Sequence, residues 1–349
     1  MVGEGTYGKV YKAKNKNTQE LVALKRIRME SERDGFPITA VREMKLLESL
    51  KHVNIVSLLE TMVERVPTKT HSDFYMVFEY MDHDLTGILN HPTFQLEPGH
   101  IKHLAKQFFE GLQYLHHRGV LHRDIKASNI LLDSNGLLKL ADFGLARFYQ
   151  KRKKGLDYTN RIITLWYRPP EILLGDTAYG PAVDIWSAGC VFAELFTRVA
   201  VFPGSTEINQ LDVIYDLLGT PTKEDWPMLT KMPWFELLKP PTRKEPKFDE
   251  KYNSSLPPAA LRLVKWIFSF DPEKRPSAEQ VLQHAYFTSE EPEAKPCSLV
   301  HLKGDWHEFE AKSRKRKERQ AAKEREAQAS RREASSTGSG EPSTEPRQR

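Results

Sequence analysis

The chain has 349 residues, of which 39% are hydrophobic, so it is long enough for two lobes with a sizeable core. Two cysteines are too few for a disulfide framework, and without a run of about 18 apolar residues no membrane-spanning helix is expected. The net charge of +5 is uneven, because residues 312–332 hold ten Lys or Arg and three Glu, or +7, which leaves about −2 for the remainder. A basic tail therefore follows a nearly neutral body.

The first 80 residues are predicted to form short strands around one helix. Segments rich in Val, Tyr and Leu predict strands at residues 5–15, 20–28, 55–66 and 74–81. A helix is expected from Pro37, whose missing N–H costs nothing at a helix start, to about Leu50.

This predicted helix has two unlike faces. On a wheel of about 100° per residue, one face is an apolar arc formed by Ala40, Met44, Leu46, Leu47 and Leu50. Glu43 lies inside that arc, and a buried carboxylate is costly unless a cation pairs with it. We expect the cation to be Lys25, and the pair would direct its ammonium group at the phosphates of a nucleotide. Ile38 and Val41 lie on the opposite, polar face.

From about residue 85 the pattern becomes helical. Apolar residues at helical spacing predict helices at residues 101–119, 182–196, 211–218, 256–270 and 277–284. Two short strands are expected at residues 129–133 and 137–142. Residues 219–258, rich in Pro, Trp and Lys, are predicted to form an irregular insert, and residues 333–349 are predicted to be disordered.

Residues 3–10 read GEGTYGKV and fit the pattern G-x-G-x-x-G-x-V. A dinucleotide-binding turn would need a strand before the glycines and a helix after them, whereas strand-like residues follow here. The pattern therefore favours a hairpin whose backbone N–H groups cover phosphates. Alone it is a weak signal, because glycine-rich turns are common.

Residues 122–129 read HRDIKASN, and the triplet Asp142-Phe143-Gly144 follows Asn129 thirteen residues later. Phosphoryl transfer with two metal ions needs an aspartate and an asparagine as ligands and a second aspartate as base. Asp142 and Asn129 fit the metal role, and Asp124 fits the base role. Taken singly, HRDIKASN also fits an ordinary polar loop, and Asp142 also fits a turn residue before glycine. Their order after the glycine hairpin and the lysine–glutamate pair predicts phosphoryl transfer.

With these motifs in place, residues 2 to about 288 resemble the eukaryotic protein kinases. The segments PITAVRE, TLWYRPPE and DIWSAGC make the chain similar to the cyclin-dependent kinases. The resemblance implies a bilobal α+β kinase fold, with a small antiparallel-sheet N-lobe that carries one helix C and a large, mainly helical C-lobe. The implied divisions are an N-lobe at 1–80, a C-lobe at 81–288, an extension with a basic helix at 289–332 and a disordered tail at 333–349.

The same resemblance implies which residues bind ATP. The site would comprise Val2, Gly3, Glu4, Gly5, Thr6, Tyr7, Gly8, Lys9, Val10, Ala23, Lys25, Phe78, Glu79, Met81, Asp84 and Leu131. Phe78 would be the gatekeeper, the backbone of Glu79 and Met81 would bond adenine, and Asp84 would meet the ribose.

The implied catalytic residues are Asp124, Lys25, Glu43 and Lys126, with Lys126 contacting the transferred phosphate, and Asn129 and Asp142 would hold Mg²⁺. An activating kinase would phosphorylate Thr159. Arginine forks suit such a phosphate, and the family's three arginine positions are Arg42, Arg123 and Arg147.

Further positions carry over from the family. Ile162 and Ile163 resemble the residues that favour proline after the target Ser or Thr. Glu171 and Arg275 resemble a structural ion pair, and Asp184 resembles the aspartate that braces the catalytic loop.

In this family the exposed face of helix C binds a cyclin, so Ile38 and Val41 are expected to contact that partner. The alternative is contact with a neighbouring loop of the same chain. We favour the cyclin, because the helix has a full apolar arc without these two residues.

The segments MDHDL, DIKASNILL, YTNRIITLWYRPPE and MPWF are similar to the transcriptional branch, the RNA polymerase II carboxy-terminal-domain (CTD) kinases and the cyclin-K-associated kinases. This implies a nuclear, cyclin-dependent kinase that phosphorylates the polymerase heptad repeats and promotes elongation, with a K-type or related cyclin and a third subunit as candidate partners. The basic segment WHEFEAKSRKRKERQ resembles an extension that can reach the nucleotide, and its alternatives are a nuclear localisation signal or a solvated helix.

Other functions remain as alternatives. Within the same class the chain could be an elongation-factor-type or cell-cycle kinase. Outside it, the chain could be a cyclin-binding scaffold without catalysis, or a nucleic-acid-binding protein acting through its basic tail. The intact set of Lys25, Asp124, Asn129 and Asp142 argues against the scaffold, and the tail has no interleaved aromatic residues to stack on bases.

Three features depart from the family pattern. Relatives begin the first strand several residues earlier, so we expect a shortened strand one or a start assigned too late. Pro169 replaces the commoner Ala of the A-P-E triplet. Thr6 and Tyr7 stand where cell-cycle relatives have inhibitory phosphosites.

Overall fold

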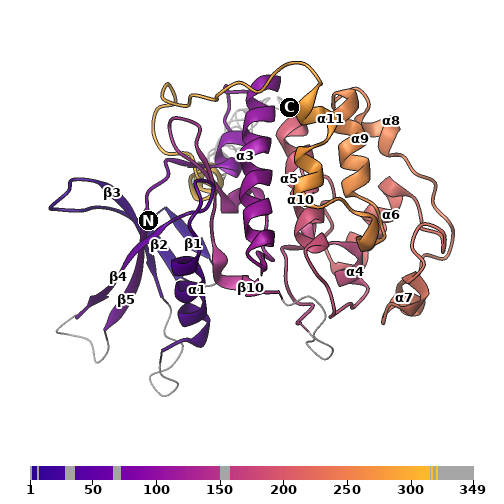
Figure 1. Cartoon of the computed structure of the whole chain (residues 1–349), viewed down its shortest axis with the longest axis horizontal. Helices are drawn as coiled ribbons and strands as arrows, with labels where there is room; N and C mark the ends of the chain where they lie inside the picture. The colour runs from indigo at the N-terminus through magenta and orange to yellow at the C-terminus, as the bar shows by residue number, and fades with distance from the viewer. Residues whose placement is uncertain are drawn as a thin grey trace, which may run out of the picture.

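The computed structural model describes residues 2–5, 8–27, 36–65, 72–149, 158–314, 316 and 320. In this part of the chain a small lobe, built on one sheet, joins a larger helical lobe (Figure 1). None of the described helices is both long enough and apolar enough to cross a membrane.

The small lobe is a five-stranded antiparallel sheet in the order β1-β2-β3-β5-β4. Its strands are β1 (Gly3–Gly5), β2 (Gly8–Lys14), β3 (Leu21–Arg26), β4 (Leu58–Glu64) and β5 (Asp73–Glu79). The centre of the sheet pairs β3 with β5, so that Lys25 lies opposite Met76. The four predicted strands are found as β2 to β5, each somewhat shorter than its predicted range, and β1 was not among the predicted ranges.

The predicted helix is α1 (Ile38–Ser49), with Pro37 as its N-cap. The side chains that the wheel placed on the core face are buried or half-buried, and Glu43 is buried among them with 5% exposure. On the other face Ile38 is 67% exposed and Val41 is half-buried. The division of this helix into two faces is therefore confirmed, including the carboxylate on the core side.

The large lobe is built around two long helices, α3 (Pro98–His117) and α5 (Ala182–Thr197). Almost every residue of α5 is buried, as expected of a helix that is apolar on all sides and lies inside the core. Shorter helices surround this pair: α2 (Leu85–Leu89), α4 (Pro170–Leu173), α6 (Glu207–Leu218), α8 (Phe248–Tyr252), α9 (Pro258–Ile267), α10 (Ala278–Leu282) and α11 (Ala285–Thr288).

The insert that was predicted to be irregular contains α7 (Phe235–Leu238) and α8, so that prediction was only partly right. Pro-rich stretches separate these short helices, which is why no helical period is visible in the sequence. The short 3₁₀ turns of the large lobe are η1 (Ala127–Asn129), η2 (Phe143–Leu145), η3 (Leu165–Tyr167), η4 (Leu229–Lys231) and η5 (Pro272–Lys274).

Two small sheets lie where the lobes meet. One has the order β6-β8-β9, from β6 (His83–Asp84), β8 (Ile130–Leu132) and β9 (Leu138–Leu140), and the other pairs β7 (Val120–Leu121) with β10 (Arg147–Phe148). These strands fix the ends of two loops, residues 122–129 and 141–146, on the side of the large lobe that faces β3.

Three predicted structural residues hold this arrangement. Arg275 makes two bonds to the Glu171 carboxylate, at 2.6 and 2.7 Å, and both side chains are buried. Buried Asp184 accepts the backbone N–H groups of His122 and Arg123, each at 2.9 Å. A buried carboxylate that receives two backbone donors fixes the loop that carries them.

After α11 the chain turns back across the large lobe to the junction between the lobes, seen as the orange-to-yellow segment in Figure 1. The backbone N–H of Trp306 donates to Asp82 O, and that of Asp84 donates to Trp306 O. Gly87 permits this approach, since a Cβ there would lie 2.0 Å from Trp306 O. Residues 308–314 then form a short helix, and the tail predicted to be disordered lies outside the described residues.

Candidate nucleotide-binding and catalytic site

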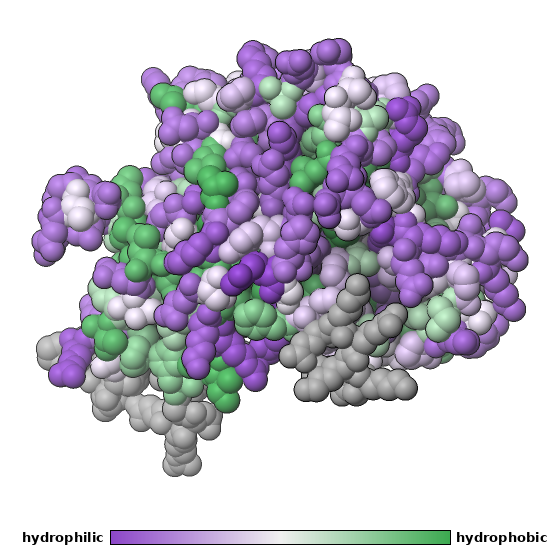
Figure 2. Space-filling model, viewed as in Figure 1, coloured by the Kyte–Doolittle hydropathy of each residue, from purple (hydrophilic) through white to green (hydrophobic). Residues whose placement is uncertain are grey.

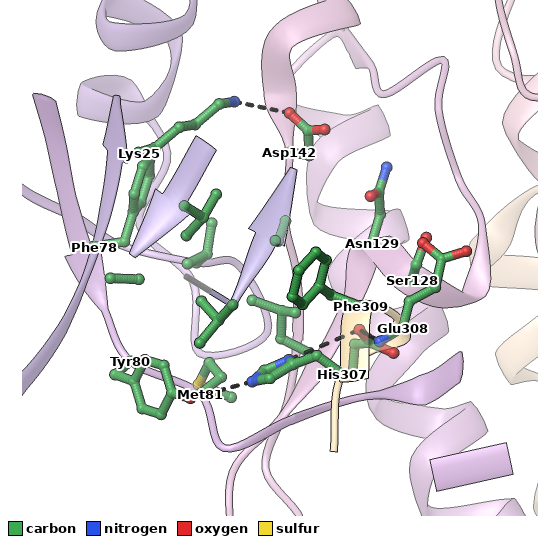
Figure 3. A pocket seen from close by; sticks show the side chains of 18 of the residues that line it. Lys25, Phe78, Tyr80, Met81, Ser128, Asn129, Asp142, His307, Glu308 and Phe309 are labelled. Atoms are coloured by element: carbon green, nitrogen blue, oxygen red, sulfur yellow. Dashed lines mark hydrogen bonds and ion pairs between the residues drawn. The ribbon is translucent and has the colours of Figure 1, made fainter. Parts of the chain in front are cut away.

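A cavity of about 310 Å³ lies between the small-lobe sheet and the large lobe (Figure 3). Most residues that were predicted to bind the nucleotide line it: Val2, Gly3, Gly8, Val10, Ala23, Lys25, Phe78, Glu79, Met81, Asp84 and Leu131. Lys9 is exposed on β2 and does not line the cavity, because neighbouring strand residues point to opposite faces. Thr6, Tyr7 and the side chain of Glu4 lie outside the described part of the chain, and Gly5 is described only as the end of β1.

The walls of the cavity are apolar and come from both lobes. Val10 and Ala23 lie on the adjacent strands β2 and β3, and Leu131 lies on β8. Phe78 of β5 is 8% exposed and closes the inner side. The hydrophobic side chains of Leu47 and Val56 also line it, and they were not predicted. A slot of this kind suits a flat heterocycle.

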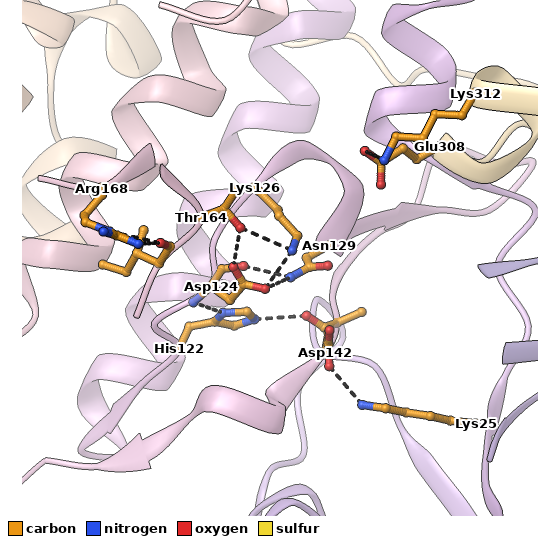
Figure 4. A network of polar contacts seen from close by, with 12 residues as sticks. Lys25, His122, Asp124, Lys126, Asn129, Asp142, Thr164, Arg168, Glu308 and Lys312 are labelled. Carbon is orange, nitrogen blue, oxygen red and sulfur yellow. Dashed lines mark hydrogen bonds and ion pairs between the residues drawn. The ribbon is translucent and has the colours of Figure 1, made fainter. Parts of the chain in front are cut away.

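At the inner end, Lys25 connects the two lobes. Its Nζ lies 2.7 Å from Glu43 Oε1 and 2.9 Å from Asp142 Oδ1, so the predicted lysine–glutamate pair is present. Figure 4 shows Lys25 and Asp142 approaching from opposite sides. The helix α1 therefore supplies a carboxylate that positions a cation inside the cavity.

Burial and charge act against each other in this triad. Burial alone would lower the pKa of Lys25, but attraction to Asp142 and Glu43 outweighs it and raises the pKa. Burial would raise the pKa of Asp142, but the nearby Lys25 lowers it overall. For Glu43, burial outweighs the effect of Lys25 and raises the pKa. Lys25 thus remains a cation that can meet phosphate oxygens.

Asp142 has a left-handed backbone, with φ 61°, just before η2. A non-glycine residue adopts this conformation at a cost of about 1–3 kcal/mol when the surroundings impose it. Here α1 packs against η2, and the N–H of the preceding Ala141 donates to Asn129 O. The fold therefore holds Asp142 beside Asn129 and turns its carboxylate toward Lys25.

Asp124 lies at the centre of a second polar cluster (Figure 4). Its Oδ2 accepts from Lys126 Nζ at 2.8 Å and from Asn129 Nδ2 at 3.0 Å. Its Oδ1 accepts from the Thr164 hydroxyl at 2.9 Å, and Lys126 also donates to that hydroxyl at 3.3 Å. The predicted catalytic residues Asp124 and Lys126 are thus adjacent, and Thr164, the first residue of TLWYRPPE, is a member of the cluster that was not predicted.

The loop under this cluster is fixed by His122. This residue is fully buried, its Nε2 lies 3.0 Å from Ala141 O, and its Nδ1 accepts the N–H of Asp124 at 3.2 Å. One ring therefore ties the loop of Asp124 to the loop of Asp142. The signal for this role was the first residue of HRDIKASN.

Asn129 and Asp142 could hold a divalent metal ion. Asn129 donates through Nδ2 to Asp124, which leaves its amide oxygen for another contact. Amide and carboxylate oxygens are ligands that Mg²⁺ accepts, and Mg²⁺ usually takes its remaining ligands from water and substrate phosphates. No group of three His, Cys, Asp or Glu residues placed to hold a metal occurs in the described ranges, so these two residues fit a metal that binds together with a nucleotide.

The predicted phosphosite, Thr159, is exposed. Its backbone oxygen accepts from the Tyr179 hydroxyl at 2.8 Å, and that hydroxyl accepts from Arg123 Nη1 at 3.0 Å. Arg123 is therefore connected to Thr159. The other two predicted arginines come from different elements. Arg42 is exposed on α1, and Arg147 is half-buried on β10.

Ile163 has a left-handed backbone, with φ 63°. Its carbonyl oxygen accepts two bonds from the Arg168 side chain, at 2.9 and 3.2 Å, and Arg168 also contacts Glu207 at 2.6 Å. The oxygen that could have accepted an N–H from a bound peptide is therefore occupied. The family resemblance implied only a preference for proline at Ile162 and Ile163, and this geometry was not predicted.

The mouth of the cavity is covered by the returning C-terminal segment. His307, Glu308, Phe309 and Lys312 line the cavity beside Tyr80 (Figure 3). The sequence suggested that this segment could reach the nucleotide, but these positions were not predicted.

Asp84 is the point where this segment is attached. Its carboxylate accepts the N–H of Gly87 at 2.7 Å and the N–H of Glu308 at 2.6 Å. Burial raises the pKa of Asp84 to about 7, against the lowering effect of these backbone bonds. The residue lines the cavity as predicted, but both carboxylate oxygens have protein partners, so a ribose would compete with the segment.

A second attachment joins the segment to the small lobe. Asp305 Oδ2 accepts from Lys12 Nζ at 2.7 Å and from the Tyr80 hydroxyl at 2.8 Å. The Tyr80 hydroxyl also lies 3.2 Å from His307 Nε2. Burial lowers the pKa of His307 to about 4, so the ring is neutral at physiological pH. The mouth is thus built by residues more than 200 positions apart in the chain.

The two predicted partner contacts, Ile38 and Val41, do not line the cavity. They lie on the face of α1 opposite Glu43. One face of the helix therefore places Glu43 in the cavity, and the other face leaves Ile38 exposed to solvent.

Comparisons with known proteins agree with this geometry. The sequence profile of the family described as "Protein kinase domain" matches residues 1–287. The chain is 59% identical over 317 residues to "CTD kinase subunit alpha" of Schizosaccharomyces pombe, covering 90% of this chain and 52% of the relative. It is 49% identical over 321 residues to the protein of the same name in Saccharomyces cerevisiae, covering 91% and 59%. The chain thus spans only about half the length of these curated relatives.

Among solved structures, the chain is similar to one in the crystal structure of the yeast RNA Pol II CTD kinase CTDK-1 complex. The TM-score is 0.78 at 48% sequence identity, and the match covers 86% of this chain and 93% of the other. The predicted bilobal fold is therefore confirmed.

Proposed function

The chain belongs to the protein kinase domain family, and we propose that it transfers the γ-phosphate of ATP to serine or threonine residues followed by proline. The observation that carries this proposal is that two charge clusters meet at one cavity, which Lys25, Glu43, Asp142 and Lys126 line. Lys25, Glu43 and Asp142 form the inner charge triad, and Asp124 with Lys126 forms the cluster beside it.

Each cluster has a distinct role in transfer. Lys25 meets the phosphates of ATP and Glu43 positions it. Asp124 accepts the proton of the attacking hydroxyl, and Lys126 at 2.8 Å from it stabilises negative charge on the transferred group. Asn129 and Asp142 would hold Mg²⁺, which supplies charge neutralisation of the phosphates when bound.

The preference for proline follows from Ile163. A substrate residue after the target would normally bring a backbone N–H that needs an acceptor, and leaving it unpaired is costly. The Ile163 oxygen is already used by Arg168, so an ordinary residue would lose a bond there. Proline has no N–H and incurs no such cost.

The substrate that we propose is the heptad-repeat carboxy-terminal domain of RNA polymerase II. Support comes from the two relatives named "CTD kinase subunit alpha" and from the similar chain in the CTD kinase complex. The proposed setting is the nucleus and the proposed process is transcription elongation. An elongation-factor-type or cell-cycle kinase is the alternative within the same class.

We further propose that a K-type or related cyclin covers the exposed face of α1, through Ile38 and Val41. Exposed apolar side chains gather on the small lobe (Figure 2). In this lobe Ile38, Val53 and Val63 are 67%, 57% and 53% exposed. Such exposure is typical of an interaction surface. A partner on this face would hold α1, and with it Glu43, in the position that pairs with Lys25.

Phosphorylation of Thr159 by an activating kinase is the second proposed control. The site is exposed, and Arg123 already connects to it through Tyr179. A phosphate at Thr159 could bind Arg123, with Arg42 and Arg147 as the further cations of the proposed site.

The test is phosphate transfer by the complex of this chain with a K-type cyclin to three peptides. The first carries heptad repeats, the second has Ala in place of each Pro after Ser or Thr, and the third is a basic Ser-Pro peptide. We expect labelling of the first, with loss of about tenfold or more in the second. Labelling of the third peptide alone would reject the polymerase substrate but keep the kinase. Labelling of none, with bound cyclin and phosphorylated Thr159, would favour the scaffold.

A further inference from the structure

Strand β9 of the large lobe carries a lysine between two leucines. Its residues Leu138, Lys139 and Leu140 are 1%, 7% and 1% exposed. Burying an ammonium group is costly unless a carboxylate or another acceptor meets it. Lys139 does not line the nucleotide cavity, and the reaction proposed above does not use it. The burial of this cation therefore needs a separate explanation.

The partner of Lys139 is the side chain of Glu79. Lys139 Nζ lies 2.9 Å from Glu79 Oε1, and the same oxygen accepts the backbone N–H of Ser57 at 2.8 Å. Lys139 belongs to the large lobe, whereas Glu79 is the last residue of β5 and Ser57 directly precedes β4. One carboxylate oxygen thus joins three segments that come from both lobes.

Glu79 lies where the small-lobe sheet ends at the cavity. The ladder between β3 and β5 ends with the pair of Val22 and Glu79, and the chain continues through Tyr80 and Met81. Glu79, Tyr80 and Met81 all line the cavity. The resemblance to kinases implies that adenine bonds the backbone of Glu79 and Met81. Because the sheet ladder stops here, the position of this backbone depends on what holds the Glu79 side chain.

The large-lobe side of this contact is itself well fixed. In the ladder between β8 and β9, Lys139 lies opposite Leu131, which is a wall of the cavity. On the other edge of β9, the Leu140 N–H donates to Asn54 O at 2.8 Å, and the Val56 N–H donates to Leu140 O at 2.9 Å. Strand β9 is therefore bonded along both edges and gives Lys139 a fixed base.

We propose that Lys139 is a positioning residue for the nucleotide. It holds the Glu79 carboxylate, and through it the backbone that accepts adenine, at a fixed distance from the wall formed by Leu131. This inference rests on the proposed function, because it places adenine in the cavity. Loss of Lys139 weakens the binding of the base and leaves the transfer step at Lys25 and Asp124 nearly unchanged.

The test is calorimetric binding of ATP, and of adenosine, which has no phosphates, to the full chain in its cyclin complex. We expect Lys139→Met to weaken both ligands by the same factor, about three- to tenfold, as for the loss of one well-placed hydrogen bond. KM for ATP should rise by this factor, with kcat and KM for the heptad peptide nearly unchanged. Lys139→Arg keeps a cation and should recover most of the affinity.

Lys102→Met is the matched control. Lys102 is a lysine of α3 that is 3% exposed and lies outside the cavity, where its ammonium group donates to Glu290 O and lies over the Tyr286 ring. Any general effect of replacing a buried lysine should appear in both variants. Only Lys139→Met should change the affinity for adenosine.

A double-mutant cycle with Glu79→Gln tests whether Lys139 acts through Glu79. The Gln amide keeps an oxygen for the Ser57 N–H, so this variant chiefly removes the charge that meets Lys139. We expect the double variant to bind adenosine no more weakly than the weaker single variant. Losses that multiply would contradict the proposal.

The same measurements separate this inference from the proposed function. If wild type binds ATP, and Lys139→Met binds ATP and adenosine as tightly as wild type, Lys139 is only structural and the proposed function stands. If wild type binds neither ligand, both are overturned.

Discussion

The nucleotide cavity has an inner end and a mouth, and the two are held together differently. At the inner end, the ammonium group of Lys25 lies between two carboxylates, 2.7 Å from Glu43 and 2.9 Å from Asp142. At the mouth, the Asp84 carboxylate is satisfied by backbone N–H groups, one of which belongs to Glu308 in the returning segment. The inner end is built from the body of the two lobes, whereas the mouth depends on a segment that arrives from the far end of the chain.

This difference separates the chemistry from access to it. Removing a charge at the inner end leaves another charge buried without its partner, which is strongly destabilising and removes a group that contacts the phosphates. Removing a contact at the mouth loosens the returning segment, whose ion pair between Lys12 and Asp305 is partly exposed. We therefore expect changes at the inner end to lower the transfer rate and changes at the mouth to alter nucleotide affinity.

The largest effect is expected from Lys25→Met. Loss of the cation should lower kcat/KM for heptad peptide phosphorylation about 10²–10³-fold, as for other preorganised electrostatic groups. Since Glu43 would then be buried without a cation, the variant should also unfold at a lower denaturant concentration.

The double variant Lys25→Met with Glu43→Gln is the matched control for that loss of stability. It should recover much of the stability and none of the activity. Recovery of activity would show that the pair is only structural.

Thr159→Ala tests how far the inner end depends on the segment that follows it. We expect the variant to be about 10–100-fold less active than the phosphorylated wild type, because the phosphate would add charge-assisted bonds at Arg123. Phosphatase treatment of the wild type should reproduce this loss and leave the variant unchanged. Equal turnover of the variant and the phosphorylated wild type would remove Thr159 from the mechanism.

The pH dependence of stability tests the mouth. Burial raises the pKa of Asp84 in the folded chain to about 7, above the ordinary value near 3.8. At a pH between these two values, Asp84 is protonated in the folded chain and ionised in the unfolded chain. The Asp84 contribution to stability is therefore fully present below about pH 4 and decreases as pH rises toward 7, by at most about 1.4 kcal/mol per pH unit. For Asp84→Asn, the free energy of unfolding measured with denaturant should change less with pH between about 4 and 7 than it does for wild type. An identical pH dependence would exclude Asp84 as its source.

The smallest effect is expected from Asp305→Ala, which removes the bonds from Lys12 and Tyr80. A partly exposed pair is worth about 0–1 kcal/mol, and the segment that it holds competes with a ribose for Asp84, so KM for ATP should fall by up to about fivefold with kcat nearly unchanged. Asp305→Asn keeps an oxygen that accepts from Tyr80, so its KM for ATP should lie between the values of wild type and Asp305→Ala. A fall in kcat without a change in KM would place this contact with the inner end instead.

The inner end and the mouth of the cavity also differ in how much of their structure could be predicted from the sequence. Glu43 in an apolar arc predicted its pairing with Lys25, because burial of a lone carboxylate is costly at any position. The spacing of Asp124, Asn129 and Asp142 predicted a common site through the family resemblance. Thr164 lay outside these motifs, and its contact with Asp124 depends on how a long segment returns to the loop.

The mouth could not be predicted at this level of detail. Its contacts join Lys12 to Asp305 and Asp84 to Glu308, and no local period or motif spacing encodes pairs separated by more than 200 residues. The short helices of the Pro-rich insert were missed for a related reason, since a helix of four or five residues contains little more than one turn of periodic signal.

The most direct test of the proposed kinase compares wild type with Asp124→Asn in the cyclin complex, measuring ATP binding and phosphate transfer to heptad peptide in the same sample. Asn has nearly the same shape as Asp but cannot accept the hydroxyl proton as readily. We expect unchanged ATP binding and a loss of transfer of about 10²–10⁴-fold. Transfer at the wild-type rate would contradict the role of Asp124 and the proposed reaction at this site.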